Sequence, residues 1–190
     1  MKSFHSARLF RVAVCLAAVS VFPSVALAAD SWADGIVDTA RNVPYLSALE
    51  KDVIREHNKV RVDPVRYAEE VIKPIIALYD GTLLKRPGEI PLRTQEGVAA
   101  ANECYRALKA MSPTGALRPS KAVTQAARDH AADQARSGQT GHTGSDGSQM
   151  QNRIMRYGST MSCGENIAYG GYAQNVGQRV ISQLLIDDGV

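Results

Sequence analysis

The chain has 190 residues, with 22 basic and 19 acidic side chains and a formal net charge of +3. Three of the basic residues, Lys2, Arg8 and Arg11, lie in the first 28 positions, which hold no acidic residue, so the remainder carries 19 charges of each sign. A neutral remainder gives no reason to expect nucleic acid or an anionic membrane as a partner. It is long enough to form one domain with its own hydrophobic core.

The first 28 residues have the pattern of a secretory signal peptide. A basic start is followed by an apolar run at residues 12–21, by Pro23, and by an A-x-A cleavage site at residues 26–28. The apolar run is about half as long as the roughly 20 residues that a membrane-spanning helix needs. We therefore predict cleavage after Ala28, a secreted or periplasmic protein, and no transmembrane segment in the mature chain.

Two cysteines, Cys104 and Cys163, remain after that cleavage. An even number of cysteines in an oxidising compartment favours a disulfide between them. The bond would close a loop of about 60 residues and stabilise the fold by about 4 kcal/mol in the chain-entropy model. Two buried free thiols are the alternative.

The first half of the mature chain is predicted to be mainly helical. Residues 29–45 mix Asp, Gly, Asn and Pro and predict a leader with little fixed structure. Apolar residues then recur every three or four positions from Leu46, with a capping box formed by Ser47 and Glu50. This helix should end at residue 63, and Pro64 should begin a second one that breaks at Pro74. Residues 79–97 hold several turn signals and predict an irregular connection.

The second half predicts four further helices and one strand. Residues 98–111 are helical in pattern, and the clearest helix covers residues 121–137 and stops at Gly138. A Gly-, Ser- and Thr-rich loop follows, then a short helix at 150–157, a strand at 165–170 and a helix at 175–186. One strand without a partner is not a stable sheet, so we expect that the chain lacks the strands that would complete it.

A histidine and a carboxylate stand out between these elements. His142 follows Gly141 in the flexible loop, and Glu165 follows Gly164 at the start of the predicted strand. An exposed loop histidine and a structural carboxylate are the alternatives to a functional pair. His130, on the alanine-rich face of the helix at 121–137, is predicted to fill the core instead.

The order of these elements resembles the CAP superfamily of cysteine-rich secretory proteins, venom antigens and pathogenesis-related proteins, and its bacterial members most. The resemblance covers residues 46–190. It rests on these features: Asn58, Arg61 and Asp63-Pro64 in the first helices; Leu117-Arg118-Pro119; the Gly141-His142 pair; Gly164-Glu165-Asn166-Ile167; and a last helix that ends in Asp187-Asp188-Gly189.

The resemblance implies an α+β fold, an α-β-α sandwich with an antiparallel sheet whose C-terminal strands are missing here. It would occupy residues 46–190, after a signal peptide at 1–28 and a leader at 29–45. The family cavity holds two histidines and two acidic residues. His142 matches the first histidine, Glu165 the first acid, and either Asp187 or Asp188 the second. The second histidine would follow residue 190, so we predict a truncated chain.

Three functions follow as expectations. The first is a binding module whose cavity holds a divalent metal, zinc or calcium, or a small apolar molecule. The second is a hydrolase that uses His142 and Glu165 as an acid–base pair. The third is a non-catalytic surface protein that contacts an envelope component. No serine lies in a nucleophile elbow, and Cys163 would be a nucleophile only without the predicted disulfide, so catalysis stays open.

Overall fold

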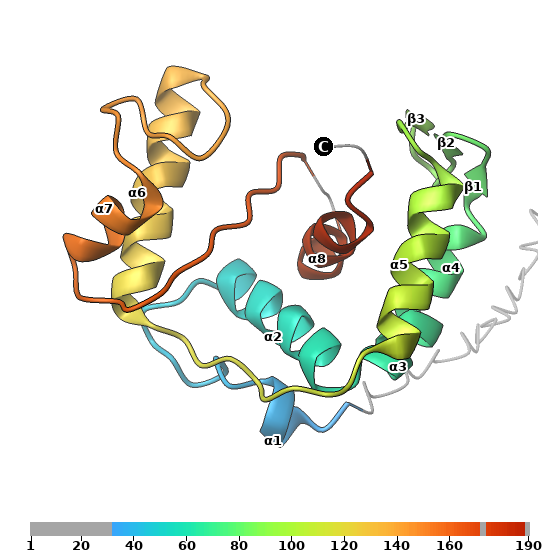
Figure 1. Ribbon diagram of the computed structural model, residues 1–190, viewed down its shortest axis with the longest axis horizontal. Helices are drawn as coiled ribbons and strands as arrows, with labels where there is room; N and C mark the ends of the chain where they lie inside the picture. The colour runs from blue at the N-terminus through green and yellow to red at the C-terminus, as the bar shows by residue number, and fades with distance from the viewer. Residues whose placement is uncertain (1–31, 172–173, 189–190) are drawn as a thin grey trace, which may run out of the picture. The chain divides into compact units, whose positions relative to one another are not determined.

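The computed structural model describes residues 32–171 and 174–188 and combines helices with one small sheet (Figure 1). Its helical elements are α1 (Asp34–Val37), α2 (Ala48–Val62), α3 (Pro64–Tyr67), the π-helical η1 (Ala68–Ile72), α4 (Lys73–Ile76), α5 (Val98–Ala110), α6 (Lys121–Ser137), α7 (Met150–Met155) and α8 (Val176–Ile186). The predicted α+β class is confirmed. The predicted signal peptide at 1–28 lies outside the described residues.

Local sequence signals set the helix boundaries. Ser47 accepts the backbone N–H of Glu50, and the Glu50 carboxylate accepts the backbone N–H of Ser47, which is the predicted capping box of α2. Gly138 ends α6 in the left-handed conformation with φ of 71°. The break predicted at Pro74 is wrong: the helical path continues through η1 into α4, and Pro74, which has no backbone N–H, lies just after the π-helical turn.

The sheet lies where no strand was predicted. β1 (Tyr79–Asp80), β2 (Leu83–Leu84) and β3 (Leu92–Arg93) form an antiparallel sheet in the order β1-β2-β3 within the stretch expected to be irregular. The strand predicted at residues 165–170 is absent, and that segment is extended without a ladder partner among the described residues. Side chains hold it instead, because the Tyr169 hydroxyl accepts the backbone N–H of Gly141 at 2.7 Å.

The N-terminal part of the described chain is packed into the core, which corrects the expectation of little fixed structure. Trp32 is buried, lies edge-on against Tyr67, and donates its indole N–H to Glu70 at 3.1 Å. Around it the core joins α1, the helices from α2 to α5 and α8, and α2 packs against α8, whose axis points toward the viewer in Figure 1. None of the described helices is both long enough and apolar enough to cross a membrane.

Asn58 and Arg61 are structural residues. The fully buried Asn58 amide donates to the Val37 and Leu117 carbonyls and accepts the backbone N–H of Leu117 at 2.7 Å. Arg61 donates to the Gly115 carbonyl at 2.9 Å. These two residues of α2 therefore fix the connection between α5 and α6, which sets where α6 begins.

The predicted disulfide is wrong, because both cysteines are free thiols. Cys104 is buried in the core on α5, where burial raises the pKa of its thiol to about 11. Cys163 is half-buried and lines a pocket together with His142 and Glu165. The two side chains thus have different environments, one in the core and one at the candidate site.

Candidate functional site

The candidate site is built on the loop between α6 and α7. Its anchor is Gly141, whose carbonyl accepts from His130 Nε2 at 2.9 Å and from Gln134 Nε2 at 2.6 Å, both on α6. The Gly141 N–H is bound by the Tyr169 hydroxyl from the far side. Because both backbone groups of Gly141 are held, the position of the next residue, His142, is fixed although it lies in a glycine-rich loop. The prediction that His130 is buried is confirmed, and its ring supports this loop.

His142, Glu165 and Arg153 form a chain of hydrogen bonds. His142 Nδ1 lies 2.9 Å from Glu165 Oε2, and Arg153 Nη2 donates to Glu165 Oε1 at 2.7 Å. The exposed fraction of the side chain falls along the chain, from 62% for His142 through 16% for Glu165 to 2% for Arg153. The imidazole therefore lies at the surface, on a carboxylate held in place by a buried guanidinium.

Arg153 also binds the loop itself. Its guanidinium donates to the Ser148 carbonyl at 2.8 Å and to the His142 carbonyl at 3.2 Å. One side chain on α7 thus holds both the backbone of His142 and the carboxylate that orients the His142 ring. Charge-assisted hydrogen bonds of this kind are stronger than neutral ones, so we name Arg153 the positioning residue of the site.

The Glu165 carboxyl is ionised in this arrangement. Burial raises its pKa, but the hydrogen bonds from His142 and Arg153 lower it by more, and the net pKa lies below the ordinary value. An ionised carboxylate only accepts hydrogen bonds, so His142 Nδ1 carries the shared proton. In the neutral imidazole the lone pair is then on Nε2, which is the nitrogen available to a ligand.

A pocket of about 490 Å³ opens beside this imidazole. His142 and Glu165 line it together with two methionines, two glutamines, Ser162 and Cys163. The methionines, Met150 and Met161, provide flexible apolar surface, and Met161 is fully exposed. The volume lies within the usual range for small-molecule sites of about 300–1,000 Å³. The pocket therefore combines an oriented hydrogen-bonding group with an apolar wall.

The two aspartates predicted as the second acid lie at the end of α8 and have other surroundings. Asp188 accepts three backbone N–H groups, from Gln95, Glu96 and Gly97, at 2.6–3.0 Å. These groups precede α5, so the carboxylate serves the N-terminus of that helix. Asp187 follows α8 in the left-handed conformation and is exposed. Neither residue lines the pocket that contains His142.

The described residues do not fit a resident metal ion. Zinc sites generally use three or four protein ligands, and the pocket supplies His142 Nε2, the Cys163 thiol and a Glu165 carboxylate whose two oxygens already accept hydrogen bonds. Within residues 32–171 and 174–188, no group of three or more His, Cys, Asp or Glu side chains could hold a metal. The divalent metal stays a prediction, and no step proposed below depends on one.

The sequence patterns did not reveal Arg153, Gln134 or Tyr169 as part of the site. Arg153 lies on α7 and the exposed Arg156 directly follows that helix as its C-cap, and only the packing of α7 separates their roles. Tyr169 lies 28 positions from the glycine that it binds, a separation that no local pattern covers. His142 and Glu165 stood out by their glycine neighbours and were matched to the family cavity through the resemblance, and the structure brings these two together.

Comparison with known proteins gives one match. The family described as the cysteine-rich secretory protein family, CAP, matches residues 54–189, which is more than two thirds of the chain. The matched range includes His142, Glu165 and Arg153. The comparisons with curated proteins and with solved structures gave no match.

Proposed function

Because the chain belongs to the cysteine-rich secretory protein (CAP) family, we propose that it is a secreted binding module for a small molecule with an apolar part and one hydrogen-bonding group. The observation that carries this proposal is the chain of hydrogen bonds from Arg153 through Glu165 to His142 at the pocket. The hydrogen-bonding group of the ligand would meet His142 Nε2, and its apolar part would lie on Met150 and Met161.

Physical chemistry supports a preorganised contact at His142. A loop histidine that is free to rotate loses conformational entropy when it binds a ligand, at about 0.5–1.5 kcal/mol for an immobilised side chain. Here Glu165 already restricts the ring, and Arg153 already restricts Glu165. Part of that entropic cost is therefore met on folding. A single hydrogen bond to Nε2 then contributes more to affinity than it would from a freely rotating ring. An envelope lipid or another amphipathic component would have the required chemistry.

A hydrolase is the second candidate, and the orientation of the imidazole favours it. A carboxylate that accepts Nδ1–H and leaves the Nε2 lone pair free is the arrangement of a histidine general base. Ser162 and Cys163 line the same pocket, although no hydrogen bond joins either of them to His142 among the interactions of the described residues. For this reason the binding module is the preferred function.

1-Octanol is a suitable probe, because it has an apolar chain and one hydroxyl group that can donate to the Nε2 lone pair. We expect His142→Ala to weaken its binding about tenfold, which corresponds to about 1.4 kcal/mol for one hydrogen bond to an oriented imidazole. Isothermal titration calorimetry on the full-length protein gives the affinity. The matched control is Gln139→Ala, which changes an exposed residue of the same loop that does not line the pocket.

Two results would count against the binding module. Equal affinity of the wild type, His142→Ala and Gln139→Ala would place the ligand elsewhere. Hydrolysis of p-nitrophenyl acetate by the wild type, with a loss of about a hundredfold or more in His142→Ala, would make the protein a hydrolase instead.

A further inference from the structure

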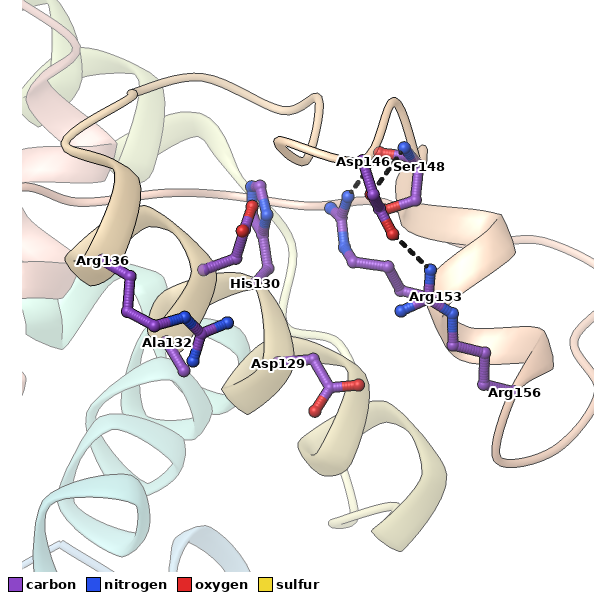
Figure 2. A pocket seen from close by; sticks show the side chains of 9 residues that line it. Asp129, His130, Ala132, Arg136, Asp146, Ser148, Arg153 and Arg156 are labelled. Carbon is purple, nitrogen blue, oxygen red and sulfur yellow. Dashed lines mark hydrogen bonds and ion pairs between the residues drawn. The ribbon is translucent and has the colours of Figure 1, made fainter.

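A second cavity, lined in part by Arg153, lies between α6 and the segment from the loop to α7. Its volume is about 320 Å³. Figure 2 shows His130 and Arg153 extending into it from α6 and α7. The residues that line it are Asp129, His130, Ala132, Asp133, Arg136, Asp146, Ser148, Arg153 and Arg156. Neither His142 nor Glu165 belongs to this set, so the cavity is distinct from the pocket discussed above.

Two deeply buried polar groups of this cavity lack hydrogen-bond partners. His130 is 4% exposed and Arg153 is 2% exposed. His130 Nδ1 and Arg153 Nε have no partner among the described residues. A buried polar group without a partner costs about 1–3 kcal/mol, and two at one cavity are unusual in a folded protein. A molecule that fills the cavity and bonds to both groups would remove that cost.

The chemistry of the two groups defines what they bind. His130 Nε2 points at the Gly141 carbonyl, which only accepts, so Nε2 carries the proton and Nδ1 of the neutral ring is an acceptor. Arg153 Nε–H is a donor. An acceptor and a donor at one cavity suit a hydroxyl group, because a single hydroxyl oxygen both donates and accepts.

The charges around the cavity exclude a simple anion site. Three aspartates face three arginines, so their formal charges cancel. The aspartates are already bound: Asp129 by the Tyr157 hydroxyl, Asp133 by Ser145, and Asp146 by Ser148 and Arg156. Their remaining lone pairs still accept hydrogen bonds from further hydroxyls. A neutral ligand suits this environment better than a phosphate or a carboxylate would.

From this geometry we propose that the cavity is a binding site for a neutral polyhydroxylated molecule, a sugar or polyol. One hydroxyl would bridge His130 Nδ1 and Arg153 Nε, and its neighbours would bind the charged groups of the rim. A single water needs only about 15 Å³ of such space, so a cavity of about 320 Å³ has room for a ligand with several heavy atoms. Arg153 also orients Glu165. A ligand that binds Arg153 in this cavity would therefore affect the Glu165 carboxylate in the pocket of His142.

The test is a titration of the full-length protein with D-glucose, followed by amide chemical shifts in two-dimensional NMR. We expect saturable shifts at tens of millimolar sugar, centred on α6 and α7. His130→Gln should weaken binding about tenfold, because the glutamine amide still reaches the Gly141 carbonyl while the Nδ1 acceptor is lost. Arg136→Ala changes the rim without touching the buried pair and should also weaken binding, whereas Arg106→Ala, an exposed residue of α5, should not.

Two outcomes would overturn the proposal. One is the absence of saturable shifts with D-glucose in the wild type. The other is binding of inorganic phosphate at the same residues in place of the sugar, which would make the cavity an anion site. Equal effects of Arg136→Ala and Arg106→Ala would also contradict it, since the sugar would then lie outside the cavity.

Discussion

Arg153→Met will destabilise the protein by about 3–5 kcal/mol, the usual cost of removing one partner from a buried ion pair. Methionine retains most of the aliphatic volume, so the change isolates the guanidinium. Without it, Glu165 lies largely buried with one uncompensated oxygen, and the carbonyls of His142 and Ser148 lose a donor. For a domain of this size the melting temperature should fall by about 10 °C or more.

The matched control is Arg156→Met, at the C-cap residue that directly follows the same helix. Arg156 pairs with Asp146, and the two side chains are 45% and 56% exposed. Surface pairs of this kind contribute at most about 1 kcal/mol. Denaturant unfolding followed by circular dichroism gives both free energies. Equal losses for the two variants would mean that Arg153 is not the centre of the loop structure.

Asp188→Asn will cost about 1–2 kcal/mol, the range for loss of a helix N-terminal cap. The Asp188 carboxylate binds three backbone N–H groups ahead of α5, and an asparagine offers one oxygen in place of two. Gly97, one of the three donors, is itself tightly packed. It has φ of 68°, and a Cβ at this residue would lie 2.7 Å from Thr82 Cα. Unfolding in urea measures the loss.

Asp187→Asn provides the control, because it removes the same charge from the neighbouring residue. Asparagine tolerates the left-handed conformation of position 187 as well as aspartate does, so stability should stay unchanged. If both variants lose the same stability, the loss comes from the change in net charge and not from the missing hydrogen bonds at the N-terminus of α5. Neither variant should change binding of 1-octanol, since neither residue lines the pocket of His142.

Acid will remove the contribution of Asp188. Burial raises its pKa, but the backbone hydrogen bonds from Gly97 and Glu96 lower it by more, so the folded-state pKa lies below the ordinary value. A lowered pKa means that the unfolded state binds the proton more readily. The stability that Asp188 provides is therefore complete above the ordinary pKa and is lost as pH falls through the folded-state value. The difference between wild type and Asp188→Asn should shrink on acidification.

The helices were predictable from the sequence where local chemistry marks their ends. α6 covers the predicted residues 121–137, and it ends as predicted because Gly138 adopts the left-handed conformation that stops it. α2 was predictable from its capping box. The sheet was not, because each strand has two residues, too few for an alternating pattern. Trp32 was missed for another reason: its partners, Tyr67 and Glu70, are distant in sequence.

The exposed part of the candidate site could be predicted from the sequence, but the buried residue that holds it in place could not. His142 and Glu165 were predicted through their order and glycine neighbours, and they form a hydrogen bond. The role of Arg153 depends on burial, which no pattern of a six-residue helix reveals. The disulfide prediction failed because an even count of cysteines says nothing of where each lies, and Cys104 belongs to the core.

The most direct test of the central claim is the position of the proton on His142, measured by nitrogen NMR of the imidazole at a pH where the ring is neutral. If Glu165 orients the ring, the proton lies on Nδ1 in the wild type. In Glu165→Ala the ring should lose its preference for that tautomer. A proton on Nε2 in the wild type, unchanged in Glu165→Ala, would contradict the account. The imidazole would then be an ordinary loop histidine, without the oriented lone pair on which binding at this pocket depends.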